Sequence, residues 1–309
     1  MKFFLGLDIG GTKTDCALAD ENRIISRAKS GSTKILRQAK TDAAISLREV
    51  LDSVSAESRV SLADVTASCI GTSGAAVAEV TEWLSQQMKM RVGGLLQIVG
   101  DEVITLDAAF PGDPGIIVIA GTGSNVIGRN RSGWTTTAGG WGPELADEGS
   151  GNRLGQQALR GIFSAINAGE EPRLLLRVLN HLGLRTRDEL IATANALGFQ
   201  FASLMPLIVE AARDGDPVAR ATLKQGGEEL AGLVLHVIRK LATTEPGIEN
   251  GLKVATTGSI VTHVEEVTDA LRQTVLAVYP QIEFMPGTVD PVEGALWHAR
   301  RLGLQNSSK

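Results

Sequence analysis

The chain has 309 residues, more than one hydrophobic core usually organises, so two domains are expected. Its 43% hydrophobic and 21% charged residues are typical of a soluble globular protein, and a formal net charge of -5 gives no support for nucleic-acid binding. No apolar run is long enough to span a membrane, and two cysteines are too few for a disulfide scaffold, so we expect a cytoplasmic protein without membrane or nucleic-acid partners.

The chain begins with an expected meander of three strands, at residues 3–9, 15–19 and 24–28. A glycine-rich turn joins the first two strands at residues 10–14. A dinucleotide-binding βαβ unit would place a helix after this turn, and Thr12 breaks the spacing of a Walker A loop. Neither of these nucleotide-binding folds is therefore predicted.

Asp8 lies near the end of the first strand, whose other residues are mostly apolar. Burying a carboxylate costs free energy unless it is paired or lies beside a metal. We interpret Asp8 as a ligand of Mg²⁺, acting through water, because Mg²⁺ keeps several waters and binds few carboxylates. The alternative is a carboxylate that only caps the turn.

The next expected strand with a polar residue at its end is 95–99, which runs into Gly100 and Asp101. Ligands of α/β sheets bind at the carboxyl ends of strands, so Asp101 is predicted to be a general base for phosphoryl transfer. The alternative is a cap for the helix expected at residues 101–110. Asp107 and Asp113 are placed less well, because one falls inside that helix and the other in a Pro/Gly loop near the expected domain boundary.

The segment from residue 116 to residue 151 organises the rest of the chain. A buried strand at 116–120 runs into Gly-Thr-Gly-Ser at 121–124, a turn suited to binding phosphate through backbone N–H groups. Gly-Gly-Trp-Gly at 139–142 and Asp-Glu at 147–148 then offer a flat apolar face and acceptors for sugar hydroxyls. The alternatives are a plain hairpin turn, a core tryptophan and a helix cap. Together these motifs favour a kinase for a small polar molecule.

The remaining chain is mostly helical in pattern over residues 152–241, and a strand at 252–256 then enters a third glycine turn at 257–259. The strand and glycine turn of residues 8–14 recur at 121–124, which suggests two similar halves that close on one ligand.

The order of these motifs resembles the BadF/BadG-type ATPase family, and within it the N-acetylglucosamine kinases, relatives of actin, hexokinases and the heat-shock chaperone ATPases. The Gly-Thr-Gly-Ser, Gly-Gly-Trp-Gly and Asp-Glu-Gly-Ser motifs are its specific part, and the resemblance covers nearly the whole chain. It implies an α/β fold of two ribonuclease-H-like (actin-like ATPase) domains, each a mixed five-stranded sheet with flanking helices, with ATP and Mg²⁺ in the cleft between them. The domains would be 1–110, completed by a helix at 292–305, and 111–291, with a helical insertion at about 152–241.

The resemblance also implies a role for each motif residue in an ATP-dependent kinase of an N-acetylated amino sugar, in a homodimer. Asp8 would hold the metal and Asp101 would be the base. The ATP contacts would be Gly10, Gly11, Thr12, Lys13, Gly121, Thr122, Gly123 and Ser124, with Gly227 and Gly258 at the adenosine. The sugar contacts would be Lys34, Ser73, Gly140, Trp141, Gly142 and Asp147.

Lys34 departs from the kinase pattern, in which Ser-Thr-Asn contributes an asparagine to the sugar. An ammonium group donates hydrogen bonds but cannot accept them as an amide can. An acidic sugar such as N-acetylmuramic acid therefore becomes a candidate substrate beside N-acetylglucosamine.

Two other functions remain as alternatives. The second branch of the family activates 2-hydroxyacyl-CoA dehydratases with an iron–sulfur cluster, which needs thiolate ligands. Cys16 and Cys69 instead fall in expected strands and are predicted to be buried. A nucleotide-dependent regulator of a partner protein would have no need for both Asp101 and the sugar-binding motifs.

Overall fold

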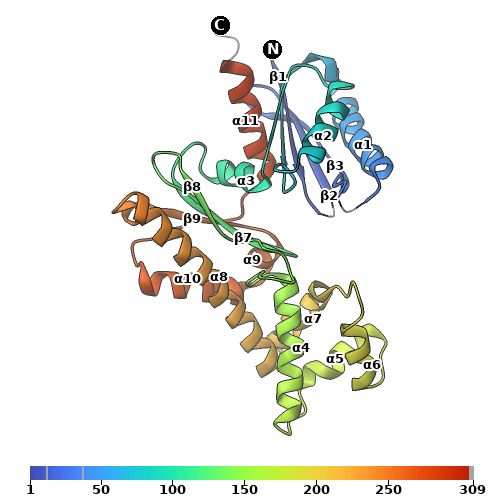
Figure 1. The fold of residues 1–309 in the computed structure, drawn as a ribbon, viewed down its shortest axis with the longest axis vertical. Helices are drawn as coiled ribbons and strands as arrows, with labels where there is room; N and C mark the ends of the chain where they lie inside the picture. Colours follow the sequence, from blue (N-terminus) through green and yellow to red (C-terminus); the bar gives the residue numbers. More distant parts are fainter. Residues whose placement is uncertain (12, 37, 306–309) are drawn as a thin grey trace. The chain divides into compact units, whose positions relative to one another are not determined.

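The structure, a computed structural model, describes residues 1–11, 13–36 and 38–305 (Figure 1). The chain divides into two compact units, Met1–Asp113 with Val289–Lys309, and Pro114–Thr288. We call them unit 1 and unit 2 and describe each by itself. Each unit is built on one five-stranded mixed sheet, as predicted.

The sheet of unit 1 has the strand order β3-β2-β1-β4-β5. Strands β1, β2 and β3 form the antiparallel meander, whereas β4 and β5 run parallel to β1. The strands are β1 (Phe3–Ile9), β2 (Lys13–Ala19), β3 (Ile24–Gly31), β4 (Val65–Thr72) and β5 (Leu95–Val99). The helices are α1 (Lys40–Ser58), η1 (Leu62–Asp64), α2 (Ala78–Lys89), α3 (Asp101–Ala109) and α11 (Pro291–Gln305).

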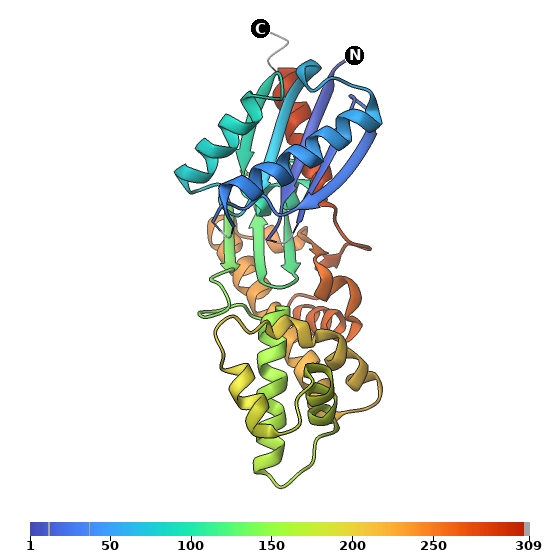
Figure 2. The same cartoon turned by 90° about the vertical axis from the view of Figure 1, so that its right-hand side faces the viewer.

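Helices cover both faces of this sheet, as Figure 2 shows with α1 and α2 in front of the strands and α11 behind them. Alternate residues of β1 supply the two cores, because successive side chains of a strand point to opposite faces. Leu5 and Leu7 pack with α1 and α2, while Phe4 packs with α3 and α11. A Cβ at Gly6 would lie 2.9 Å from the backbone nitrogen of Leu296, so β1 and α11 are in close contact.

Both cysteines are buried in strands of unit 1, as predicted. Cys16 belongs to β2 and Cys69 to β4, and both thiols are free. Burial raises the pKa of the Cys69 thiol to about 12, so it stays protonated and unreactive near neutral pH.

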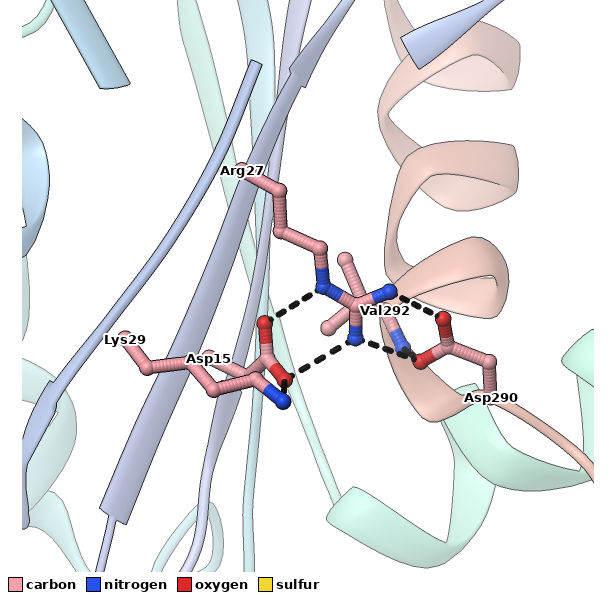
Figure 3. A network of polar contacts seen from close by, with 5 residues as sticks. All are labelled: Asp15, Arg27, Lys29, Asp290 and Val292. Atoms are coloured by element: carbon pink, nitrogen blue, oxygen red, sulfur yellow. Dashed lines mark hydrogen bonds and ion pairs between the residues drawn. The ribbon is translucent and has the colours of Figure 1, made fainter.

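Arg27 ties the start of α11 to the sheet of unit 1 (Figure 3). Its guanidinium donates to both oxygens of Asp15, at 2.8 and 2.9 Å, and to both oxygens of Asp290, at 2.5 and 3.0 Å. Lys29 lies 3.3 Å from Asp15, and Asp290 accepts from the backbone N–H of Val292. Burial alone would raise the pKa of Asp15, but Arg27 and Lys29 lower it below its ordinary value. Asp15 is therefore an ionised structural carboxylate.

The sheet of unit 2 has the order β10-β9-β6-β7-β8, which is the same topology as in unit 1. An antiparallel meander, β6 to β8, is again followed by two parallel strands. The strands are β6 (Gly115–Ala120), β7 (Ser124–Arg129), β8 (Thr135–Gly139), β9 (Lys253–Thr257) and β10 (Glu283–Phe284). The sequence pattern did not reveal β8, whose residues are mostly threonine.

Residues 152–241 are largely helical, as predicted. The helices of unit 2 are α4 (Gly151–Asn167), α5 (Arg173–Leu182), α6 (Arg187–Ala194), η2 (Phe201–Leu204), α7 (Met205–Arg213), α8 (Pro217–Thr244), η3 (Ile248–Asn250), α9 (Ser259–His263) and α10 (Glu265–Val278). Within the described residues, no helix is long and apolar enough to cross a bilayer.

Candidate active site

The carboxyl ends of β1, β4 and β5 bring three predicted site residues to one edge of the sheet in unit 1. Asp8 pairs in register with Gly71, and Gly71 pairs with Val99, so the three strands end at a common edge. Ser73 follows β4 directly, and Asp101 follows β5 after Gly100. We call this the unit 1 edge, and its position is where parallel sheets bind their ligands.

Lys34 reaches the unit 1 edge from the loop after β3. Its Nζ donates to Ser73 Oγ at 2.5 Å, and its backbone N–H donates to Ser32 Oγ at 3.2 Å. Ser32 in turn donates to the carbonyl of Gly10 at 3.0 Å. The loop that carries Lys34 is therefore fixed to the β1–β2 turn.

The β1–β2 turn is closed by a hydrogen bond from Gly10 N to the Lys13 carbonyl at 2.9 Å. Gly10 and Gly11 are half-buried, and the Lys13 side chain is exposed. Thr12 lies outside the described residues, so its predicted contact with ATP stays a prediction.

Asp8 is a strongly perturbed carboxylate of the unit 1 edge. Burial raises its pKa to about 6, and the negative charges of Asp101 and Asp15 act in the same direction. Lys34 and Lys13 lower the pKa in part. A carboxylate in these surroundings gains more than an exposed one from a nearby cation, which fits a Mg²⁺ ligand.

Glu102 is a candidate that the sequence reasoning missed. Its carboxyl folds back over Gly100, where an added Cβ would lie 2.1 Å from Oε1. Burial and a side-chain hydrogen bond with Asp101 raise the pKa of Glu102 to about 7. The signal in the sequence that could have indicated Glu102 is its position directly after Asp101, the expected base.

Asp101 itself is the first residue of α3, and the N-cap position belongs to Gly100. Its Oδ1 accepts from the backbone N–H of Glu102 at 3.1 Å. Asp107, the weaker candidate, is buried and accepts from Gly112 N and bonds His298 Nε2, both at 2.9 Å. Asp107 therefore has a structural role within α3 and α11.

The edge of the sheet in unit 2 carries two glycine turns. Strands β6 and β9 are parallel, with Ile119 opposite Thr257, so the turn at 121–124 and Gly258 follow neighbouring strand ends. Gly258 has φ 103°, and a Cβ there would lie 2.3 Å from the Ala120 carbonyl oxygen. Only glycine fits this position without strain. We call this the unit 2 edge.

Helix α4 holds the 121–124 turn from the other side. Gly151 N donates to the Gly121 carbonyl at 2.8 Å, and Asn152 N donates to the Thr122 carbonyl at 3.3 Å. The turn itself is closed by Gly121 N and the Gly123 carbonyl at 2.9 Å. The turn is thus fixed by its neighbours rather than left as a free hairpin.

Asp147 supports this turn directly. Its side chain is buried, with 6% of the residue exposed, and Oδ1 accepts from the backbone N–H of Ser124 at 3.0 Å. Burial raises the pKa of Asp147, although the bonds from Ser124 and Ser150 oppose the increase. The alternative role as a cap of the next helix is wrong, because Ser150 is the N-cap of α4.

Trp141 is 70% exposed, so it is not a core residue. Its neighbours Gly139, Gly140 and Gly142 all have positive φ, between 76° and 93°. Gly142 also pairs with Ala146 in an isolated bridge, which turns the chain back toward Asp147. The backbone therefore presents the indole to solvent on a turn that needs glycine.

Gly227 has a clear packing role. It lies in α8, where a Cβ would be 2.3 Å from the Val267 carbonyl oxygen of α10. This packing role does not test the predicted contact of Gly227 with adenosine, which stays a prediction.

Among the described residues, no three His, Cys, Asp or Glu side chains are grouped closely enough to hold a metal ion.

A family model, the BadF/BadG/BcrA/BcrD ATPase family, matches residues 5–299 of the chain. The chain belongs to this family. This confirms the resemblance inferred from the motifs.

Several of the similar proteins are named as sugar kinases. The N-acetylmuramic acid/N-acetylglucosamine kinase of Clostridium acetobutylicum is 29% identical over 307 residues, covering 97% of this chain and 99% of the relative. The N-acetyl-D-glucosamine kinase of Dictyostelium discoideum is 28% identical, covering 95% and 96%. A solved structure from Chromobacterium violaceum, provisionally named an N-acetylglucosamine kinase, has a TM-score of 0.73 and 27% identity, covering 96% and 98%. The predicted actin-like ATPase fold is thereby confirmed.

Proposed function

We propose that the protein is an ATP-dependent kinase that phosphorylates an N-acetylated amino sugar. The observation that carries the proposal is the unit 1 edge, where Asp8, Ser73 and Asp101 lie at the ends of neighbouring strands and Lys34 donates to Ser73. The relatives in the same family, which match this chain over nearly its whole length, support the sugar as substrate. The two compact units would be the two domains of the family, with residues 152–241 as the helical insertion.

In the proposed reaction, Asp101 accepts the proton of a sugar hydroxyl as the hydroxyl oxygen bonds to the γ-phosphorus. The bond from that phosphorus to the ADP oxygen breaks at the same centre. Asp8 would hold Mg²⁺ through water, and a bound Mg²⁺ neutralises charge on the phosphate oxygens. The remaining work of the chain is to bind and orient the substrates.

The backbone N–H groups of the two glycine turns, at 10–13 and 121–124, would bind the phosphates, and Gly227 and Gly258 would face the adenosine. Gly140, Trp141, Gly142 and Asp147 would bind the sugar together with Lys34 and Ser73. Because Lys34 carries a charge, we propose that it influences the choice between a neutral and an acidic sugar.

We further propose a cytoplasmic homodimer. Two free, buried thiols suit a reducing compartment. The dimer rests on the family resemblance alone, and light scattering of the purified protein would test it.

The test of the function is ADP release from ATP and Mg²⁺ in the presence of a panel of amino sugars. We expect release to depend on an N-acetylated hexosamine. Release that no sugar changes would contradict the kinase and favour a nucleotide-dependent regulator.

A further inference from the structure

A cavity of about 920 Å³ lies within unit 2, beside the proposed sugar-binding loop. Residues 143–148 and helix α4 both line it, and we call them the loop wall and the α4 wall. Ile191 and Phe201 add an apolar part from α6 and η2. The cavity shares Asp147 with the sugar-binding residues, so a substituent on the bound sugar could extend into it.

The two walls carry opposite charges. The loop wall presents Glu144 and Glu148 in addition to Asp147, whereas the α4 wall presents Arg153 and Arg160. The two arginines are seven residues apart, which places them on one face of the helix, two turns from each other. A ligand that fits both walls needs hydrogen-bond donors at one end and a negative charge at the other.

The two arginines of the α4 wall differ in the partners that they already have. Arg153 lies 3.6 Å from Glu229 of α8. Arg160 is exposed and has no ion-pair partner in the described part of the chain.

We propose that this cavity binds a carboxylate-bearing substituent of an N-acetylated amino sugar, and that Arg160 recognises the carboxylate. The inference rests on the proposed sugar kinase activity. A guanidinium binds a carboxylate through two parallel N–H donors, which a lysine cannot match. Leu159 and Phe163 also line the cavity on this part of α4 and offer apolar contact beside the charge.

Arg160 is independent of Lys34, the residue that the sequence indicated for the same purpose. Lys34 belongs to unit 1 and already donates to Ser73. The two residues can therefore be tested separately as determinants of sugar specificity.

The experiment compares N-acetylmuramic acid with N-acetylglucosamine as substrates of the full chain and its variants. Arg160→Gln should lower the ratio of kcat/KM for the acidic sugar to that for the neutral sugar at least about tenfold, because a hydrogen bond to a charged group is lost. The change should come mainly from KM for the acidic sugar. Arg160→Lys keeps the charge and should restore part of the ratio. Arg187→Gln removes an exposed arginine of α6 outside the cavity and should leave the ratio unchanged.

A ratio that stays constant in Arg160→Gln, with the neutral sugar still phosphorylated, would overturn the inference and leave the proposed function intact. If the wild type phosphorylates no sugar, the proposed function fails, and calorimetric binding of N-acetylmuramic acid then decides the inference. Binding that Arg160→Gln weakens about tenfold supports the cavity, and equal or absent binding overturns it.

Discussion

The two sheet edges share one topology and differ in chemistry. At the unit 1 edge the groups are side chains: Asp8, Lys34, Ser73, Asp101 and Glu102, with the pKa of Asp8 at about 6 and that of Glu102 at about 7. At the unit 2 edge the groups are mainly backbone, in turns that need glycine. Its buried acid, Asp147, is bonded to the turn itself.

This difference teaches that the topology decides where a ligand can bind. The residues at the strand ends decide which chemistry is possible there. Parallel strands ending together create a binding edge in both units. Burial of carboxylates at one edge suits proton and metal chemistry, whereas N–H groups at the other suit phosphate. The predictions below test this division, from the largest expected effect to the smallest.

Replacing Asp101, the proposed base, should have the largest effect. Asp101→Asn keeps the oxygen that accepts from Glu102 N but loses the charge and most of the basicity. We expect kcat to fall at least about a hundredfold, with little change in ATP binding or melting temperature. Steady-state kinetics give kcat and KM for ATP, and thermal unfolding gives the melting temperature. The matched control is Asp64→Asn, at an exposed site in η1. Near-normal turnover in the folded variant would show that the base lies elsewhere.

At the unit 2 edge, Asp147→Ala removes the acceptor for Ser124 N. A buried N–H without a partner costs about 1–3 kcal/mol, so the turn should loosen and KM for ATP should rise roughly tenfold. Asp147→Asn keeps an acceptor oxygen and should affect KM for ATP much less.

Initial rates at varied ATP and varied sugar distinguish a turn-supporting role of Asp147 from a sugar contact. If both Asp147 variants raised only KM for the sugar, Asp147 would be a sugar contact and not a support of the phosphate turn.

Lys34→Asn should have a smaller effect than Asp101→Asn or Asp147→Ala, because Lys34 is only partly buried. The property that should change is the preference between sugars. We expect the ratio of kcat/KM for N-acetylglucosamine over N-acetylmuramic acid to rise about three- to tenfold. The two sugars in competition, with products separated by chromatography, give the ratio directly. An unchanged ratio would remove Lys34 from the sugar site.

Glu102→Gln should change the pH dependence of stability by the smallest amount. Because the folded pKa of Glu102 is raised to about 7, the native state binds more protons than the unfolded state between about pH 4.5 and pH 7. Its stabilising contribution is complete below this range and is lost as the pH rises through it. The free energy of unfolding, from urea titrations in EDTA at several pH values, should therefore fall less steeply in the variant. A slope equal to that of the wild type would contradict the raised pKa.

The fold and several candidate site residues could be predicted from the sequence because they depend on local patterns. Apolar strands that run into glycine turns predicted β1, β6 and both turns, and Asp8 and Asp101 stood out as acids at strand ends. Strand β8 escaped notice because alternation is weak in a run of threonines.

The remaining features depend on contacts between distant residues. The bond from Ser124 to Asp147 joins residues 23 positions apart, and the tie of Arg27 to Asp290 spans 263 positions. The cavity beside α4 likewise requires the loop, α6 and η2 to be placed around the helix. The periodic spacing of apolar residues in the sequence does not indicate such contacts.

The most direct test of the central claim is to identify the product. The purified protein is incubated with ATP, Mg²⁺ and N-acetylglucosamine or N-acetylmuramic acid, and the sugars are analysed by mass spectrometry. The account predicts a sugar that has gained one phosphate, formed in equal amount with ADP, and its near absence with Asp101→Asn. ADP and inorganic phosphate formed without any phosphorylated sugar would contradict it.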